Sequence, residues 1–463
     1  MKDKRSLEVK ILHYRDFIVP TKEVYRSALK DLIQVIDESY DEMLSLGLKS
    51  KARNNYVEKL IHKTKENPFP KYEWFDEKYP KMPSYFRRNV ITEALGKVSS
   101  YRENFALWEK NGKVGKCPKL ILNHNSFPTF YKGNTFVNSL EENKCEIKLF
   151  NPKKGKNNQG VWEYYTLDLR ATDCKRIIKL CGGDKSKISN PTLTRRGKCW
   201  YLRFLITNDI DLIDVEKENE SGNLEKICSV DLGFNTLATC TIMDKNGTIH
   251  NRKFIKNTLL IDRLDHTLNR IKKAQRLGAK RPKYLWAKAN NYNETLATYC
   301  AKEIVAFAKE NGCSTIVLEY LDTKGKKNKL GKMKQKISLW RHRDINKKVE
   351  RFAHRESMHY SRVCAINTSK LAFDGSGVVL RGHKVSNTTP YDICKFQNDK
   401  IYNCDLNASY NIGARYFIRK LFKSTNASLW SLVVAKVPPL RARMLCTLDT
   451  LIKANECLAS LTS

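Results

Sequence analysis

The chain has 463 residues, 41% of them apolar, so it is long enough to bury a sizeable core and is not a disordered chain. Its 85 Lys and Arg against 49 Asp and Glu leave a formal net charge of +36, spread along most of the sequence. This excess predicts a polyanionic partner and favours nucleic acid over a membrane surface, because no stretch reaches the roughly 18 consecutive apolar residues of a membrane span.

The first residues, MKDKRSLEVKILHYRDF, lack the apolar core of a signal peptide, so a cytosolic location is expected. The 14 cysteines are accordingly expected to be reduced thiols rather than disulfides. They form no CxxC pair in the sequence.

The N-terminal half is predicted to combine β structure with a helical segment. A strand-like pattern covers Ser6 to Val19, and long helical patterns then run to about residue 111, among them SYFRRNVITEALGKVSSYRENFALWEK. From Lys119 to about Leu212 the pattern changes to short β-rich pieces, such as GVWEYYTLDL and KCWYLRFLITN, separated by turn signals. A small barrel or sheet is expected there.

A polar, acidic segment from Asp214 to Lys226 is predicted to be a linker. After it, ICSVD and LATCTI are predicted strands around a tight LGFN turn. Helical stretches follow, and CSTIVLEYLD returns to strand. This alternation predicts an α/β fold for the C-terminal half.

Three acids occupy comparable positions in this region. Asp231 and Glu319 each stand at the end of an apolar strand, and Asp405 stands at the start of the helical pattern in YNCDLNASYNIGARYFIRKL. A single acid in such a place is most often a turn former or a helix cap. Three together are what a two-metal phosphodiester hydrolase requires, because Mg²⁺ prefers hard oxygen ligands.

The same residues carry a resemblance to a known family. Asp231 in VDLGFNTLAT, Glu319 in TIVLEYLD and Asp405 in CDLNASYNIGARY resemble the three RuvC motifs of the transposon-encoded TnpB nucleases and of compact type V CRISPR effectors. The resemblance implies an RNA-guided DNA endonuclease with a single active site. In it, these three carboxylates would be the catalytic ligands of two Mg²⁺ ions, or of Mn²⁺ in their place.

The resemblance also implies the organisation of the chain. An α/β multidomain protein is expected, with an RNase H-like (RuvC) nuclease domain C-terminal to a wedge-like β-barrel that carries an inserted helical recognition domain. The expected ranges are 1–19 for the first barrel strand, 20–118 for the recognition domain, 119–212 for the rest of the barrel, 213–226 for the linker and 227–463 for the nuclease domain. The last would include a degenerate ribbon insert at about 367–404 and a C-terminal extension from about 423.

The implied partners are a guide RNA and a target double-stranded DNA with one displaced single strand, in a bacterial, nucleoid-associated setting without a membrane. Base pairing with the guide would give specificity, and the protein would read a short adjacent motif in duplex DNA. Two alternatives stay open. One is a nuclease-silent RNA-guided DNA-binding regulator, and the other is a guide-independent transposase or integrase on an RNase H-like fold.

The sequence departs from the family at the zinc ribbon, which carries four cysteines in two CxxC pairs between the last two motifs. Ala372 and Gly375 stand where the first two cysteines are expected, and Cys394 has no partner three residues later. A metal-free hairpin is therefore predicted, and zinc is not expected. The residual candidate zinc ligands are Cys394 and Cys404, with Cys364 and His383.

Basic residues near aromatic ones are candidate nucleic-acid contacts, because Lys and Arg neutralise phosphates. In the dense basic run between Asp322 and Tyr360, the Lys- and Gly-rich first half is predicted to be a mobile loop over the active site, and the second half to be helical. An ordinary solvated helix is the alternative. The candidate contacts are Arg87, Arg88 and Lys132 in the N-terminal half, and Arg341, Arg343, Lys347, Lys348 and Arg351 on the predicted helix.

Overall fold

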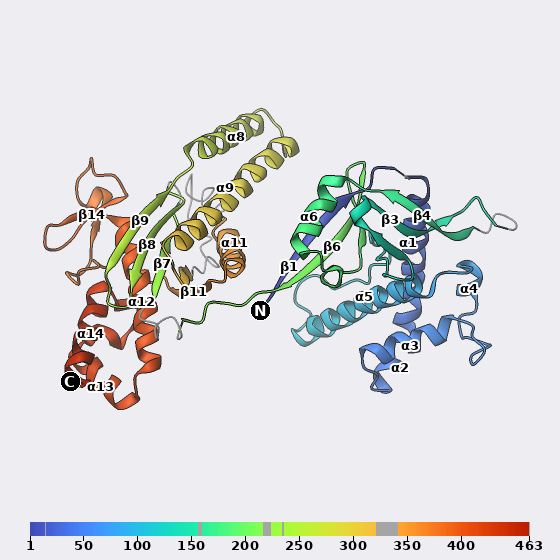
Figure 1. Cartoon of the computed structure of the whole chain (residues 1–463), viewed down its shortest axis with the longest axis horizontal. Helices are drawn as coiled ribbons and strands as arrows, with labels where there is room; N and C mark the ends of the chain where they lie inside the picture. Colours follow the sequence, from blue (N-terminus) through green and yellow to red (C-terminus); the bar gives the residue numbers. More distant parts are fainter. Residues whose placement is uncertain (14, 156–159, 216–223, 234–235, 321–340, 463) are drawn as a thin grey trace. The chain divides into compact units, whose positions relative to one another are not determined.

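The computed structural model describes the chain except for residues 14, 156–159, 216–223, 234–235, 321–340 and 463 (Figure 1). The chain forms two compact units. One consists of Lys2–Asp209, and the other consists of Ile210–Ser463 together with Met1. This division falls beside the segment expected to be a linker. In the part of the chain that the structure describes, no helix is long and apolar enough to cross a membrane.

The N-terminal unit contains two three-stranded antiparallel sheets. In one of them β1 (Lys2–Lys10) pairs along its whole length with β6 (Cys199–Asp209), which pairs on its other side with β5 (Thr192–Arg196). Along β6 the buried Leu202 alternates with the exposed Arg203, as expected for a sheet with one face in the core. The first strand of the chain therefore completes a sheet whose other members come from the end of the unit.

The second sheet lies between these strands in the sequence. It comprises β2 (Phe136–Ser139), β3 (Lys144–Asn151) and β4 (Val161–Asp168), paired in that order. An isolated bridge between Ile11 and Leu169 links the segments that follow β1 and β4. Helix α6 (Ala171–Cys181) packs against β1 and β6.

The helical segment begins earlier than the sequence suggested. Strand β1 ends at Lys10, and α1 (Arg15–Glu38) starts inside the range predicted to be strand. Ile18, Tyr25 and Leu29 are buried at helical spacing along α1, so packing of this face selects helix there. Helix α5 (Ser84–Lys110) coincides with the predicted helical segment. Between them lie α2 (Tyr40–Ser45), α3 (Ser50–Ile61) and α4 (Trp74–Lys78).

The C-terminal unit is built on a five-stranded sheet with the order β11-β10-β7-β8-β9. Strands β7, β8 and β9 form an antiparallel meander. Strand β10 runs parallel to β7, and β11 runs parallel to β10. The bounds are β7 (Lys226–Asp231), β8 (Ala238–Asp244), β9 (Ile249–Ile255), β10 (Thr315–Tyr320) and β11 (His359–Cys364).

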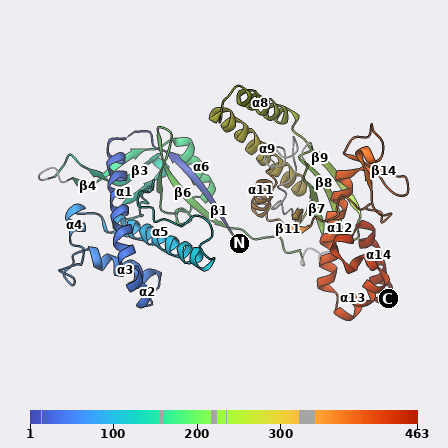
Figure 2. The same ribbon diagram turned by 180° about the vertical axis from the view of Figure 1, so that it is seen from behind.

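Helices cover both faces of this sheet, as Figure 1 and Figure 2 show from opposite sides. Helix α12 (Cys404–Ser424) packs on one face, where it shares a core with Ile227 of β7. Helices α9 (Lys283–Glu310) and α11 (His342–Arg355) cover the other face, where they share a core with Cys228. Successive side chains of β7 therefore face different helices. This alternation is typical of a strand that is buried on both faces of its sheet.

Three further parts complete the C-terminal unit. Helix α8 (Thr258–Arg276) packs along α9. A small sheet between β11 and α12 contains β12 (Leu380–Arg381), β13 (Ile393–Lys395) and β14 (Ile401–Asn403). After α12, helices α13 (Ala427–Lys436) and α14 (Leu448–Thr462) pack against each other, and α14 also contacts α12.

Gly413 provides a test of the packing of α12 on the sheet. A Cβ atom there would lie 2.9 Å from Met243 Sδ and 3.1 Å from Ser229 Oγ, and both neighbours are fully buried. Gly413→Val should overpack this interface and lower the free energy of unfolding by about 1–3 kcal/mol in chemical denaturation. The control is Gly96→Val in α5, where nothing lies within 4 Å and the expected change is under about 0.5 kcal/mol. Equal losses in the two variants would contradict this packing.

Candidate active site

Two of the predicted acids end neighbouring parallel strands. Asp231 is the last residue of β7, and Glu319 is the last but one of β10. The strands pair with Val230 opposite Leu318, so the two acids that follow occupy adjacent positions at the same edge of the sheet. Asp231 lies four residues after Ile227, and Glu319 lies two residues after Val317. Because side chains alternate along a strand, both acids lie on the face of the sheet that α12 covers.

The third acid lies in the first turn of α12. Asn403 caps this helix, since its Oδ1 accepts hydrogen bonds from the backbone N–H groups of Asp405 and Leu406, both at 3.0 Å. An acid in the first turn is favoured by the helix dipole. The guanidinium of Arg381, in β12, lies 3.5 Å from the carboxylate of Asp405. The structure thus brings all three acids to one end of the sheet.

The charges of the three acids influence one another. Burial raises the pKa of Asp231 well above its usual range, the charges of Glu319 and Asp405 raise it further, and Arg381 opposes the shift. Burial also raises the pKa of Glu319, against the hydrogen bond from Thr368. For Asp405, burial again raises the pKa, and Arg381 again lowers it. The trio therefore holds more negative charge than its neighbours compensate.

This donor set suits a divalent metal ion, because Mg²⁺ binds carboxylate oxygens and would offset their repulsion. The side chains do not converge on one point, however: among the described residues, no three His, Cys, Asp or Glu side chains lie close enough to hold a metal ion together. Thr368 Oγ1 donates to Glu319, and Arg381 pairs with Asp405. Metal binding would therefore require the acids to exchange these contacts for the ion.

Three polar side chains of α12 hold the segment that follows β11. Asn407, Asn411 and Arg415 are spaced four residues apart and are at most 5% exposed, so they form one inner face of the helix. Asn407 Nδ2 donates to the carbonyl of Leu371, and Asn411 Nδ2 donates to that of Thr368, both at 2.9 Å. The helix that carries the third acid therefore also fixes the residue that contacts the second.

Arg415 is a buried cation whose partners are all neutral. It donates hydrogen bonds to four backbone carbonyls, those of Cys364 (2.6 Å), Ile366 (2.7 Å), Met444 (3.0 Å) and Cys446 (3.1 Å). Burial lowers the pKa of the Arg415 guanidinium, and the charge of Glu319 is among the influences that oppose this shift. Such a residue ties the end of β11 to the C-terminal extension and supplies positive charge to the acidic site.

Sequence reasoning missed Thr368, Arg381 and Arg415 as neighbours of the acids. A signal for the last of these was present, because the buried α12 carries Asn, Asn and Arg at four-residue intervals within an otherwise apolar face. For Thr368 and Arg381 there was none, since each reaches its acid only through the path of the chain between β11 and α12.

The inserted segment between β11 and α12 has an apolar core. Ala372, one of the positions expected for cysteine, is buried with Cys394 and Cys404. Gly375, the other, has a φ of +77°, and a Cβ there would lie 2.5 Å from a carboxylate oxygen of Asp449. A cysteine at this position would therefore be strained in this fold.

Cys394 and Cys404 lie side by side. Their mutual hydrogen bond lowers the pKa of the Cys394 thiol and raises that of Cys404. Cys364 is the last residue of β11 and lines a different part of the unit, and His383 packs its ring against Tyr391 with centroids 5.5 Å apart. Within the described residues, these four do not form a group able to hold a metal ion.

The basic candidates of α11 divide into two kinds. Arg341 pairs with Asp344 at 2.9 Å, and Lys348 Nζ donates to Thr298 Oγ1 at 2.8 Å, so both take part in contacts within the unit. The other three candidates, Arg343, Lys347 and Arg351, are exposed and four residues apart, so they form one stripe along the helix. The basic loop predicted over the active site falls on residues 321–340 and lies outside the described residues.

Of the basic candidates in the N-terminal unit, Arg87 is corrected by the structure. Its side chain is buried and pairs with Glu58 at 3.0 Å, so it is not accessible to a phosphate. Arg88 shares the same carboxylate at 3.0 Å but keeps its side chain half exposed. Lys132 Nζ donates to the carbonyl of Ile188.

Comparisons with known proteins agree with the predicted resemblance to TnpB proteins. A family model described as the Aq_aa04 family matches residues 4–151. The TnpB-like protein aq_aa05 of Aquifex aeolicus (strain VF5) is 27% identical over 258 residues, which cover 51% of this chain and 80% of that protein. The predicted resemblance to TnpB and type V CRISPR effectors is therefore confirmed.

A solved structure of a Cas12 protein shares the mixed α/β, multidomain fold of this chain. The structure of CasPhi-2 (Cas12j) bound to crRNA and phosphorothioate-DNA aligns with a TM-score of 0.52 at 10% identity, covering 89% of this chain and 91% of that one. The mini-RNA-guided endonuclease CRISPR-Cas_phi3 aligns with a TM-score of 0.45 at 10% identity, covering 89% and 92%.

The raised pKa of Asp231 makes its ionisation oppose folding. The folded state binds this proton more tightly than the unfolded state, so the associated stability is present at low pH and is lost as pH rises through the raised pKa. Asp231→Asn should raise Tm at about pH 8 in a chelator, by about 2–4 °C per kcal/mol relieved. The gain should shrink near pH 4.

The control for this prediction is Asp265→Asn on the exposed side of α8, which should give no pH-dependent gain. A lower Tm for Asp231→Asn than for the unmodified chain at about pH 8 would show that the Asp231 carboxylate stabilises the fold, contrary to the electrostatics described above.

Proposed function

We propose that this chain is an RNA-guided endonuclease that cuts DNA by Mg²⁺-dependent hydrolysis at a single RuvC-like site. The observation that carries the proposal is the placement of Asp231, Glu319 and Asp405 by β7, β10 and α12 at one end of one sheet, near enough for their charges to repel. The sheet, with three antiparallel strands followed by two parallel ones, supports an RNase H-like nuclease domain.

The relatives and the charge support a nucleic-acid partner. One relative is named a TnpB-like protein, and the CasPhi-2 structure is that of a protein bound to crRNA and phosphorothioate-DNA. A net charge of +36 suits a protein that holds a guide RNA and a DNA target. In such a complex the guide reads the target by base pairing, while the protein recognises the shape of the heteroduplex and a short duplex motif beside it.

In this proposal Asp231, Glu319 and Asp405 hold the metal ions. When bound, a pair of Mg²⁺ ions would supply an activated water and charge stabilisation for the leaving 3′ oxygen. Thr368 orients Glu319 through its hydroxyl, and Arg381 balances part of the charge of Asp405. With one active site, the two strands of the target would enter and be cut in turn.

The N-terminal unit has the parts that the proposed organisation needs. In this proposal its two sheets, one of them completed by β1, form the wedge-like β-barrel, and α1 to α5 form the helical recognition domain. Arg88, Lys132 and the exposed stripe of α11 are proposed to contact phosphates.

Removal of one acid tests the catalytic assignment. Asp231→Ala should abolish cleavage of a target DNA, because the ion loses one of its carboxylate ligands, and should leave the amount of copurifying RNA unchanged. Gel analysis of labelled target and quantification of bound RNA are the two measurements. Asp265→Ala, an exposed change of the same type, is the control. An Asp231→Ala variant that still cuts would falsify the assignment.

The stripe on α11 is tested by charge reversal. Lys347→Glu with Arg351→Glu removes two exposed cations and should weaken DNA binding, with the slope of log K against log salt reduced by about 1.8 for duplex DNA. Titration at several salt concentrations measures this. Lys423→Glu with Lys436→Glu changes the net charge equally at exposed sites on α12 and α13 and is the control. The same slope for both pairs would remove α11 from the DNA contacts.

Treatment of the purified chain with RNase separates the guided nuclease from a transposase or integrase. A guided enzyme should carry a discrete structured RNA, whose loss should end cleavage of the matching target. Sequencing of that RNA would identify the target to test. Cleavage or strand transfer that survives RNase would favour the guide-independent alternative.

A further inference from the structure

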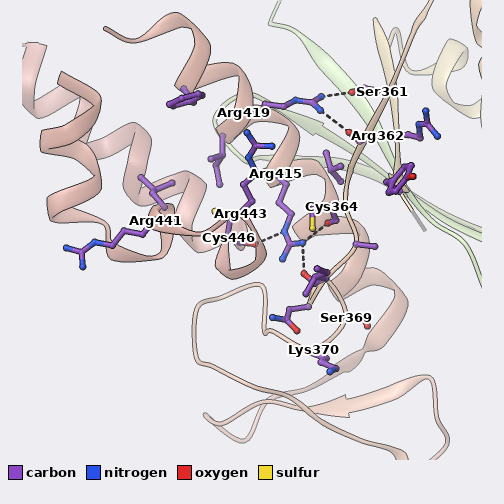
Figure 3. Close-up of a pocket in the computed structure, with 18 of the residues that line it drawn as sticks. Ser361, Arg362, Cys364, Ser369, Lys370, Arg415, Arg419, Arg441, Arg443 and Cys446 are labelled. Carbon is purple, nitrogen blue, oxygen red and sulfur yellow. Dashed lines mark hydrogen bonds between the residues drawn. The ribbon is translucent and has the colours of Figure 1, made fainter. Parts of the chain in front are cut away.

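The C-terminal unit contains a large cavity beside the acidic site, between β11, α12 and the C-terminal extension. Its volume is about 1450 Å³. One wall is β11 and the residues after it, the second is the end of α12, and the third is α13 with the turn at residues 438–446 (Figure 3). Tyr320, which directly follows Glu319, is one of the residues that line it.

The lining of this cavity, called here the arginine pocket, is strongly basic. Six cationic side chains line it, and Glu350 is the one acid among its described lining residues. Among the described residues, none of these cations forms an ion pair with a carboxylate. The six are Arg362, Lys370, Arg415, Arg419, Arg441 and Arg443. A concave surface with this charge attracts an anion from solution.

Two of these arginines build the wall, and two are available to a ligand. Arg415 is 5% exposed and holds its carbonyl partners on both sides of the pocket, while Arg419 donates to the Arg362 carbonyl at 2.9 Å and to Ser361 Oγ at 2.5 Å. Figure 3 shows these two reaching toward β11, with Arg441 and Arg443 on the neighbouring turn. Arg441 and Arg443 are both exposed.

Exposed aromatic rings accompany the positive charge. Tyr320 is 58% exposed and Phe422 is 51% exposed, and both line the pocket. Their rings are therefore accessible to a ligand in it. The guanidinium of Arg362 lies 5.4 Å from the ring centre of Tyr320, and the rings of Phe422 and Trp430 meet edge to face at 5.5 Å. Aromatic faces beside arginines are the surfaces on which nucleobases stack in proteins that bind single strands.

We propose that the arginine pocket binds a nucleotide of a single-stranded nucleic acid. Its phosphate pairs with Arg441 and Arg443, and its base stacks on the aromatic rings of Tyr320 or Phe422. A phosphate alone would leave the aromatic side unused, and an apolar ligand would leave the cations uncompensated. This inference rests on the proposed function in one respect, that the partner is a nucleic acid. Its test measures binding and requires no cleavage.

The test is binding of fluorescent decamers to the full chain, freed of RNA and kept in a chelator so that nothing is cut. The probes are oligodeoxythymidine, oligouridine and a decamer of abasic deoxyribose of the same length. Arg441→Glu with Arg443→Glu should weaken binding at least tenfold and reduce the salt slope by about 1.4 for a single strand. The control pair Lys423→Glu with Lys436→Glu should change affinity less than threefold.

The base is tested separately from the phosphate. The unmodified chain should bind the abasic decamer about 5- to 150-fold more weakly than oligodeoxythymidine. Phe422→Leu, which keeps an apolar side chain at an exposed position, should reduce this difference. Tighter binding of oligodeoxythymidine would assign the pocket to a DNA strand, and tighter binding of oligouridine would assign it to RNA.

Two results would overturn the inference. In one, the Arg441 and Arg443 pair behaves like the control pair, so that these cations touch no phosphate. In the other, the unmodified chain binds the abasic and natural decamers equally, so that no base is stacked. Neither result depends on Asp231, so failure of the pocket and failure of the nuclease assignment are distinguishable.

Discussion

The packing of α12 across the central sheet is the interaction on which the C-terminal unit depends. Its apolar side shares a core with the sheet, and its inner polar face, formed by Asn407, Asn411 and Arg415, holds the backbone that follows β11. Asp405 lies in the first turn of the same helix. A shift of α12 would therefore displace one acid directly and release Thr368, the hydroxyl partner of Glu319.

The acidic site and the arginine pocket lie on two sides of this arrangement and carry opposite charge. Three carboxylates at the sheet edge repel one another, which costs folding stability in the absence of a cation. Arg415 is buried between the two, with neutral carbonyls as its hydrogen-bond partners and Glu319 near enough to influence its pKa. Such unbalanced charge fits the binding roles proposed for both sites, because apolar residues would pack there at lower cost.

The inserted segment between β11 and α12 is held in place by packing. Ala372 and the thiols of Cys394 and Cys404 form its buried core, and the ring of Phe373 packs against Tyr402 and Tyr410 with centroids 5.1 Å from each. These contacts join the segment to α12, so its position follows that of the helix. Arg381 reaches Asp405 from this segment, which links its orientation to the acidic site.

The sequence by itself determined helix α5 and the positions of the three acids, two near the ends of strands and one at the start of a helix. It could do so because period-two and helical patterns are local properties of the chain. It misplaced the start of α1, where burial of one face outweighed a strand-like pattern. Only the tertiary structure decided that Arg87 is buried against Glu58, that Thr368 and Arg381 contact the acids, and that arginines from distant segments line one pocket. The physical reason is that each of these contacts joins residues far apart in the sequence, where no local spacing records which side chains will meet.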